Sequence, residues 1–235
     1  MIYKRILLKL SGESLAVKNG NGISADKLLE YAKQIKTVTA IGCQTGIVIG
    51  GGNIFRGVQG TALGIDRIQG DYMGMVATVI NSMALQDALQ KQGVKCEILS
   101  ALPIDPIARK MSSSRAIKLL EDGYVVIMAG GTGSPFFTTD SGAALRAAEI
   151  RAEVLLKGTR VDGIYSADPE KVVNAVKFDT LTFDECLQKN LKVMDMTAFT
   201  LCRENNIAVH VFNMDVAGNL EKVVNGESIG TIVRI

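Results

Sequence analysis

The sequence predicts an α/β fold in which a mostly parallel central sheet is covered by helices. Short apolar segments alternate with longer amphipathic segments, which is the pattern of repeated strand–helix units. Several apolar segments lack the alternation of a half-buried strand, as expected for strands buried on both faces of a parallel sheet. No linker rich in proline or serine interrupts the 235 residues, so we expect one domain over residues 1–235.

The elements of this fold follow one another in a regular order. The predicted strands cover residues 3–10, 46–49, 96–99, 124–129, 154–157, 208–212 and 231–235. The predicted helices cover residues 25–41, 71–91, 113–121, 140–150 and 194–205, with another helix after Gly218. Thr182 and Glu185 form a T-x-x-E capping box, which predicts a further short helix near Phe183.

The overall composition excludes several classes of protein. The 26 Lys and Arg residues nearly balance the 24 Asp and Glu residues, so we expect neither a nucleic-acid binder nor a membrane-surface binder. No apolar run approaches the roughly 20 residues that a membrane span requires. The first predicted strand begins close to the start of the sequence, so we expect no signal peptide and a cytoplasmic location.

The cysteines and the single histidine do not form a recognisable metal site. The four cysteines lie far apart and include no C-x-x-C pair, whereas a zinc site needs a cluster of such ligands. We therefore expect reduced thiols. His210 lies in the apolar run 208–212, where a structural role is expected rather than a catalytic one.

Glycine and small hydroxyl residues follow at least four of the predicted strands. These segments cover residues 9–13, 50–57, 130–140 and 158–169. Ligands of parallel sheets bind beyond the carboxyl ends of the strands, so the four segments should meet at one edge. Because glycine lets backbone N–H groups approach an anion closely, the pattern predicts a site for a large polyanionic ligand.

Two basic residues in these segments are candidates for binding phosphate. Lys9 ends the first predicted strand beside Ser11 and Gly12, where its ammonium group could stabilise a transferring phosphoryl group. Arg56 follows the glycine triplet and carries a planar guanidinium group that can pair with two phosphate oxygens. In the alternative interpretation, Lys9 extends its ammonium group into water and Arg56 is an ordinary surface residue.

The familiar phosphate-binding signatures are absent from the sequence. It contains no G-x-x-x-x-G-K-[ST] motif, and no G-x-G-x-x-G motif follows the first predicted strand. These absences argue against a P-loop enzyme and against a dinucleotide-binding domain. The catalytic-loop signature of protein kinases is missing as well.

Six longer motifs occur in a fixed order along the chain. They are L-L-K-L-S-G-E, V-I-G-G-G-N-I-F-R-G, G-D-Y-M-G-M, G-T-G-S-P-F-F-T-T-D-S, K-G-T-R-V-D-G-I-Y-S-A-D-P and K-V-M-D-M-T-A-F. As a set they resemble the motifs of the bacterial-type uridylate kinases (UMP kinases) of the amino acid kinase superfamily, from about residue 3 onward. The resemblance implies a three-layer α/β/α sandwich and a homohexamer. It also implies transfer of the γ-phosphoryl group of ATP to UMP with Mg²⁺, which serves pyrimidine nucleotide biosynthesis.

The resemblance also implies roles for individual residues. The ATP-binding residues would be Lys9, Leu10, Ser11, Gly12, Gly52, Arg56, Thr159, Tyr165 and Asp168. The UMP-binding residues would be Gly51, Asp71, Thr132, Gly133, Ser134, Pro135, Phe136, Phe137, Thr138 and Thr139. Mg²⁺ would be bound through the ATP phosphates, and no metal-ligating residue is assigned.

The implied catalytic residues are Lys9, Arg56 and Asp140. Asp195 also matches an aspartate near the reaction centre of the family. An alternative for Asp140 is a plain helix N-cap, because it precedes a predicted helix. Asp71 would contact the acceptor ribose from the start of a helix.

Departures from the family pattern concern regulation. Many relatives are activated by GTP through a loop that corresponds here to residues 17–22. Gln86, Gln90, Glu97 and Tyr124 stand where several relatives carry Arg or His. A guanine nucleotide would lose charge-assisted contacts, so the resemblance does not extend GTP activation to this chain. UTP remains a candidate feedback inhibitor.

Two alternative functions stay open at this point. A kinase of the same fold could phosphorylate a carboxylate or a carbamate, such as an acylated amino acid. A non-catalytic protein that binds or stores nucleotides could use the same scaffold. The segments G-D-Y-M-G-M and F-F-T-T-D favour a nucleotide acceptor, whereas Lys9 and Arg56 favour catalysis.

Overall fold

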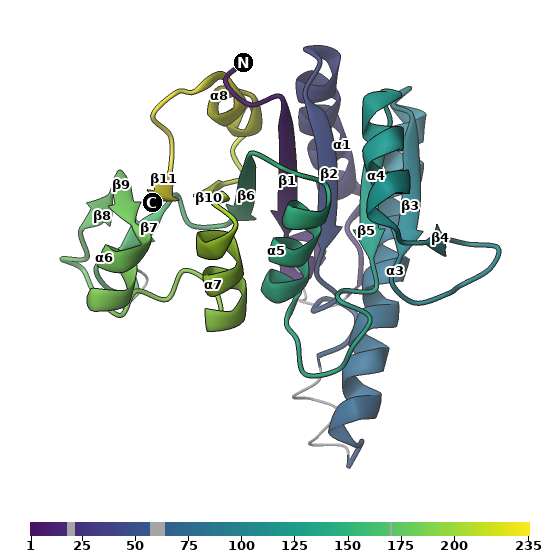
Figure 1. Ribbon diagram of the computed structural model, residues 1–235, viewed down its shortest axis with the longest axis horizontal. Helices are drawn as coiled ribbons and strands as arrows, with labels where there is room; N and C mark the ends of the chain where they lie inside the picture. The colour runs from purple at the N-terminus through teal and green to yellow at the C-terminus, as the bar shows by residue number, and fades with distance from the viewer. Residues whose placement is uncertain (18–21, 57–63, 170) are drawn as a thin grey trace.

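The computed structural model describes residues 1–17, 22–56, 64–169 and 171–235, and its main feature is one continuous sheet (Figure 1). Within these residues the sheet contains β1 (Arg5–Leu10), β2 (Gln44–Ile49), β3 (Cys96–Ser100), β4 (Arg109–Lys110), β5 (Val125–Ala129), β6 (Val154–Thr159), β9 (Thr180–Thr182), β10 (Ala208–Asn213) and β11 (Thr231–Arg234). Their order is β4-β3-β5-β2-β1-β6-β10-β11-β9. Neighbouring strands are parallel except the antiparallel pair β10 and β11, which confirms the predicted mostly parallel sheet.

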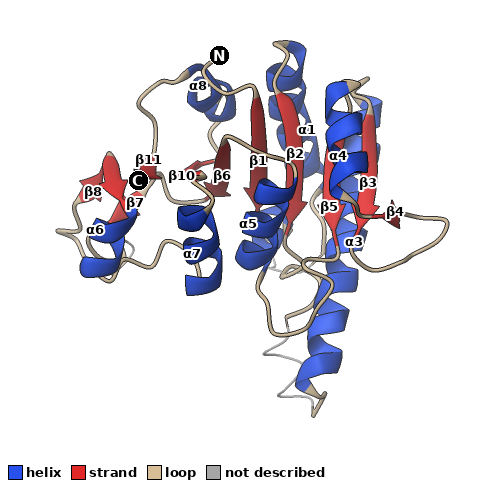
Figure 2. Cartoon of the chain, viewed as in Figure 1, coloured by secondary structure: helices blue, strands red, loops and turns tan. Residues whose placement is uncertain are grey.

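Helices cover both faces of this sheet, as Figure 2 shows. One face carries α1 (Ala25–Ala40), α3 (Arg67–Lys91) and α8 (Asn219–Asn225). The other face carries α4 (Ser113–Glu121), α5 (Thr139–Glu149), α6 (Phe183–Gln188) and α7 (Met196–Glu204). The arrangement is the expected three-layer α/β/α sandwich. None of the helices in the described part of the chain is both long enough and apolar enough to cross a membrane.

The central strands are apolar on both sides because helices cover both sides. In β1, Ile6, Leu8 and Leu10 belong to the core beneath α1 and α3, whereas Leu7 belongs to the core beneath α4 and α5. All four side chains are fully buried. Burial of successive residues on opposite faces accounts for the missing apolar–polar alternation in the sequence.

The start of α3 differs from the prediction. The helix begins at Arg67 rather than at Asp71 because Asp66 acts as its N-cap, with a carboxylate oxygen accepting hydrogen bonds from the N–H groups of Ile68 at 2.9 Å and Gln69 at 3.4 Å. Aspartate is among the strongest N-cap residues. Asp71 therefore lies one turn inside the helix, and the prediction that it stands at a helix start is wrong.

Several short elements were also missing from the prediction. The strands β4 and β9 have two and three residues, and the separate antiparallel pair β7 (Ile164–Tyr165) and β8 (Lys177–Phe178) has two residues in each strand. Segments of this length carry too few residues for a recognisable periodicity. The capping box of Thr182 and Glu185 is present at the start of α6, as predicted.

The single histidine is a buried structural residue. His210 on β10 is 7% exposed, and its Nε2 forms a hydrogen bond with the carbonyl oxygen of Ile229. Burial lowers the pKa of His210 below its ordinary value, because charging the ring would require desolvation. The four cysteines are buried and unpaired, in agreement with the expectation of free thiols.

Acidification should therefore destabilise the fold through His210. The unfolded chain takes up the proton near the ordinary pKa of about 6.5, whereas the folded chain takes it up only at lower pH. The free energy of unfolding should fall as the pH drops below about 6.5. Urea denaturation at pH 7.5 and 5.5 measures this loss in the wild type and in His210→Gln. We expect a smaller loss in the variant, and equal losses would contradict the assignment.

Candidate functional site

Two lysines and one aspartate form a buried ionic cluster at the C-terminal edge of the sheet. Lys9 on β1 and Lys157 on β6 are direct neighbours in the parallel register. The Nζ atoms of Lys9 and Lys157 lie 2.8 Å and 2.7 Å from the two carboxylate oxygens of Asp140, in the first turn of α5. Only 12% to 17% of each side chain is exposed. We call these three residues the lysine–aspartate cluster.

The electrostatics of this cluster favour an anionic ligand. Burial alone would raise the pKa of Asp140, but the two neighbouring ammonium groups hold it below its ordinary value. Burial lowers the pKa of Lys157, and the charge of Lys9 acts in the same direction while Asp140 opposes both. With both lysines protonated and the carboxylate ionised, the cluster has one excess positive charge. Phosphate oxygens can offset that charge.

Asp140 is not the N-cap of α5, so that alternative is wrong. Thr138 is the N-cap, and its Oγ1 accepts hydrogen bonds from the N–H groups of Asp140 at 3.1 Å and Ser141 at 3.2 Å. The Asp140 carboxylate is thereby left for the two lysines. A threonine hydroxyl two residues earlier in the sequence caps the helix instead.

Asp195 connects the start of α5 to the start of α7. Its carboxylate caps α7 by accepting a hydrogen bond from the N–H of Ala198 at 3.0 Å. The same carboxylate accepts hydrogen bonds from the hydroxyls of Thr138 and Ser141, the latter at 2.9 Å. Asp195 therefore holds the start of α5 against α7 and makes no hydrogen bond to Lys9 among the contacts of the described residues.

Lys157 was not among the site residues predicted from the sequence. Its Nζ also donates a hydrogen bond to the carbonyl oxygen of Val193 at 2.6 Å, so α5 and the segment before α7 both fix its position. The available signal was its place at the end of an apolar strand before Gly158 and Thr159, which parallels Lys9 before Leu10 and Ser11. Only the register of β1 and β6 makes the two lysines neighbours.

A cavity of about 360 Å³ lies beside the N-terminal half of α3, and we call it the α3 cavity. The loop 130–138 and the segment after β2 form its other walls. Of the predicted UMP-binding residues it is lined by Gly51, Asp71, Thr132, Ser134, Phe137, Thr138 and Thr139. Gly52 and Arg56, which the resemblance gave to ATP, line this cavity too. Gly133, Pro135 and Phe136 are not among its lining residues.

Glycine is required at two points of this site because the backbone segments approach one another closely. A Cβ atom at Gly12 would lie 2.5 Å from the carbonyl oxygen of Gly50. A Cβ atom at Gly51 would lie 2.8 Å from the Cβ atom of Ala77 and from the carbonyl oxygen of Gly74 on α3. The loops after β1 and β2 therefore pack against each other and against α3 only because they lack side chains.

Arg56 lies at the rim of the α3 cavity and is held from two sides. Its Nη2 lies 2.8 Å from Oε1 of Glu13, and its Nε donates a hydrogen bond to the carbonyl oxygen of Gly52 at 3.2 Å. Both side chains are half exposed. Gly57, the last residue of the same motif, lies outside the described residues.

Two further cavities lie along β6, and we call them the β6 cavities. The larger, of about 670 Å³, is lined in part by Lys157, Thr159, Tyr165 and Asp168. The smaller, of about 290 Å³, is lined in part by Lys9, Ser11, Lys157, Thr159 and Asp168. The shared lining residues show that the two cavities adjoin. Leu10 is fully buried, so only its backbone is available to a ligand.

The lysine–aspartate cluster lies between the α3 cavity and the β6 cavities. Lys9 and Lys157 line the β6 side, and Thr139, the neighbour of Asp140 in the sequence, lines the α3 side. A ligand in the α3 cavity and a ligand in the β6 cavities would therefore come together at the cluster. The two ammonium groups would face the atoms at which the ligands meet. The described residues contain no group of three or more His, Cys, Asp or Glu side chains that could hold a metal ion.

The structure describes only some of the positions that correspond to regulatory residues of the relatives. Residues 18–21 of the loop 17–22 lie outside the described residues. Gln86 donates a hydrogen bond to the carbonyl oxygen of Cys96 at 3.2 Å, and the ammonium group of Lys95 lies 5.7 Å from the centroid of the Tyr124 ring. Both side chains have partners within the chain.

Comparison with known proteins agrees with this arrangement. The model of the amino acid kinase family matches residues 4–213. A uridylate kinase of Parabacteroides distasonis is 60% identical over 231 residues, which cover 98% of this chain and 98% of that protein. A uridylate kinase of Bacteroides thetaiotaomicron is 58% identical with the same coverage of both chains.

Solved structures lead to the same family. The UMP kinase of Bacillus anthracis matches with a TM-score of 0.97 and 36% identity, covering 100% of this chain and 97% of that chain. The UMP kinase of Ureaplasma parvum matches with a TM-score of 0.94 and 40% identity, covering both chains fully. The matched residues 4–213 include the lysine–aspartate cluster and the residues around both kinds of cavity. The chain belongs to the amino acid kinase family.

Proposed function

We propose that this protein is a UMP kinase, which transfers the γ-phosphoryl group of ATP to UMP and releases ADP and UDP. The observation that carries the proposal is the buried lysine–aspartate cluster between the α3 cavity and the β6 cavities. The relatives named uridylate kinase, at 58% to 60% identity over 98% of the chain, support UMP as the acceptor. They do not favour the carboxylate kinase or the non-catalytic binder.

The chemical step would be a direct transfer in line, without a covalent enzyme intermediate. Phosphoryl transfer depends mainly on the positions of the two substrates and on neutralisation of charge. Lys9 and Lys157 would contact the oxygens of the transferring group and of the leaving ADP. Asp140 would hold the two ammonium groups apart at fixed positions, since each of its oxygens already binds one of them.

UMP would occupy the α3 cavity. Asp71 would accept hydrogen bonds from the ribose hydroxyls, because a carboxylate has acceptor positions beyond those that its protein contacts use. Arg56 would approach the UMP phosphate with its planar guanidinium group. The loop 132–139 would enclose the base, and its hydroxyl and backbone groups would contact the base edges.

ATP would occupy the β6 cavities, with its phosphates at the cluster. Ser11 and Gly12 would offer backbone N–H groups near the phosphates, and Thr159, Tyr165 and Asp168 would lie along the nucleoside. Gly52 lines the α3 cavity and would approach the transferring phosphoryl group from that side. Mg²⁺ would be carried by the ATP phosphates, where it would neutralise part of their charge. This fits the protein groups present, because the Asp140 carboxylate is already engaged by two lysines.

The proposal extends to the organisation of the protein. The continuous sheet from β1 to β11 supports a single catalytic domain over residues 1–235. We also propose a role in pyrimidine nucleotide synthesis in the cytoplasm, with UTP as a candidate feedback inhibitor. GTP activation is not proposed, for the reasons of charge given above.

We propose self-association as a homohexamer on the basis of the family, and one face of α3 supports contact between copies. Six large apolar side chains of α3 are exposed, namely Ile68, Tyr72, Met73, Val76, Ile80 and Met83. Residues 72–86 contain no charged side chain. Together with Ile54 and Phe55, part of this face lines an apolar hollow of about 400 Å³. Monomers rarely expose such a continuous apolar surface, so a second copy of the chain is the proposed occupant.

The acceptor can be identified by a coupled assay of ADP release. The assay contains ATP and Mg²⁺ with UMP, CMP, dTMP, AMP or GMP, each with and without GTP. We expect UMP-dependent turnover well above that with the other nucleotides, and little change on adding GTP. Turnover with acetylglutamate or carbamate but not with UMP would instead favour a carboxylate or carbamate kinase.

Removal of either lysine should impair the chemical step. We expect Lys9→Met and Lys157→Met each to lower kcat by on the order of 10²-fold, by analogy with loss of one preorganised donor at a developing charge. Lys91→Met is the matched control, because Lys91 forms an exposed ion pair with Asp87 on α3. Urea denaturation checks that each variant is folded. A kcat near the wild-type value in folded Lys157→Met would exclude its proposed role.

A charge on the exposed face of α3 should disrupt self-association. We expect Val76→Glu to give a smaller assembly than the wild type in light scattering after size exclusion, because the contact would bury an unpaired carboxylate. Lys91→Glu changes a charged position near the end of the same helix and serves as the control. An unchanged molar mass for Val76→Glu would show that this face is not the interface.

A further inference from the structure

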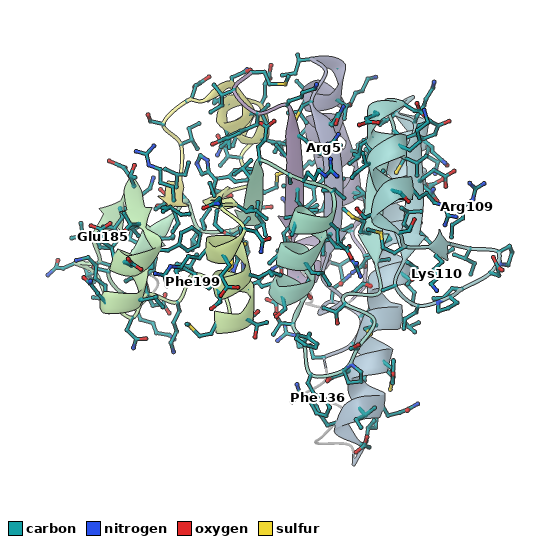
Figure 3. The ribbon with its side chains drawn as sticks, in the orientation of Figure 1. Arg5, Arg109, Lys110, Phe136, Glu185 and Phe199 are labelled. Atoms are coloured by element: carbon teal, nitrogen blue, oxygen red, sulfur yellow. The ribbon has the colours of Figure 1, made fainter. Side chains whose placement is uncertain are left out.

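One side chain, Arg67, joins the start of α3 to the tip of the loop 130–138. Its Nε lies 3.0 Å from each carboxylate oxygen of Asp71. Its guanidinium carbon lies 5.7 Å from the centroid of the Phe136 ring. The N–H of Phe136 donates a hydrogen bond to Asp71 at 2.7 Å, which closes a ring of three residues. Figure 3 shows Phe136 beside the N-terminal part of α3, beyond the edge of the sheet.

Arg67 is poorly placed to stabilise its helix. It is the first residue of α3, where the positive end of the helix dipole disfavours a cation. A cation four residues before an aspartate is also the less favourable order for such a pair. At the other end of α3, Asp87 and Lys91 form the favourable order, with an N–O distance of 2.6 Å. The position of Arg67 therefore calls for a different explanation.

The loop tip needs a partner that holds it in place. Phe136 has a φ of 71°, which is unusual for a bulky residue and persists only where the surroundings maintain it. Its side chain is 65% exposed, so burial in a core does not hold it. The contacts described for Phe136 are the hydrogen bond to Asp71 and the stacking of Arg67 on its ring.

The carboxylate of Asp71 also needs a partner that offsets its charge. Its side chain is only 14% exposed, and it lines the α3 cavity together with Arg67. An unpaired carboxylate would repel an anionic ligand there. The Nε of Arg67 contacts both oxygens, so its guanidinium group offsets the charge of the carboxylate.

We propose that Arg67 is a positioning residue for the acceptor nucleotide. It orients the carboxylate of Asp71 toward the α3 cavity, and it holds the loop 130–138 through Phe136 in the conformation that accepts the nucleotide. The inference rests on the proposed function of this cavity as the site of a nucleoside monophosphate. It concerns acceptor binding and leaves the phosphoryl-transfer step to the lysine–aspartate cluster.

The test compares Arg67→Gln with the wild type in equilibrium binding of UMP by calorimetry and in steady-state kinetics. We expect the Kd and KM for UMP to rise by about 10-fold or more, since a charge-assisted contact of this kind is worth roughly one such factor. The KM for ATP and kcat should change by less than about 3-fold, because uniform binding of the acceptor is what is lost. Asp71→Asn should show the same pattern.

Two further variants separate positioning from mere charge. Arg67→Lys keeps the charge beside Asp71 but not the planar group over Phe136, so its Kd should lie between those of the wild type and Arg67→Gln. Phe136→Leu should weaken UMP binding as well. Its effect combined with Arg67→Gln should be smaller than the product of the two single effects, because both remove the same contact. Lys91→Gln, which removes the comparable pair at the other end of α3, should leave UMP binding unchanged.

The outcomes distinguish this inference from the proposed function. If the wild type binds no UMP, the proposed function fails. If the wild type binds UMP and folded Arg67→Gln binds it with the same Kd, only the role of Arg67 fails. If kcat and the KM values for both substrates change together with the stability to urea, Arg67 has a purely structural role and the inference is overturned.

Discussion

The fold and the chemistry of this protein meet in the lysine–aspartate cluster. Two ammonium groups on adjacent strands would repel each other at this depth, and the carboxylate of Asp140 on α5 is what allows them to lie together. Removal of one partner would leave an uncompensated buried charge. The position of α5 over β1 and β6 is therefore tied to the same interaction that forms the proposed binding site for phosphate.

Helix α3 connects the site with the surface of the protein. Its N-terminal half carries Asp71 and Gly74 toward the α3 cavity, whereas Val76 and Ile80 lie on its exposed apolar face. A contact between copies on that face would also support the wall of the cavity. Assembly and acceptor binding would then depend on one helix, and Arg67 at its first turn links that helix to the loop 130–138.

Much of this could be predicted because it depends on local patterns. The apolar run around Ile6 to Leu8 has no alternation, and only a strand with helices on both sides satisfies that pattern. Glycines at the strand ends, such as Gly12 and Gly51, were predicted to allow close backbone approach to a ligand. The close contacts that require these glycines in the structure are with other segments of the protein. The order of the motifs indicated the family, which the comparisons confirm.

What the sequence by itself determined is the fold class, the edge of the sheet that carries the candidate site, and the family. The tertiary structure decided which side chains act together. Lys157 lies beside Lys9 because of the register of β1 and β6. Asp140 contacts both lysines because Thr138, and not Asp140, is the N-cap of α5. Asp71 lies inside α3, rather than at its start, because Asp66 is the N-cap of that helix. Local propensities depend on residues that are close in the sequence. These pairings join residues from distant segments, and only the packing of those segments brings them together.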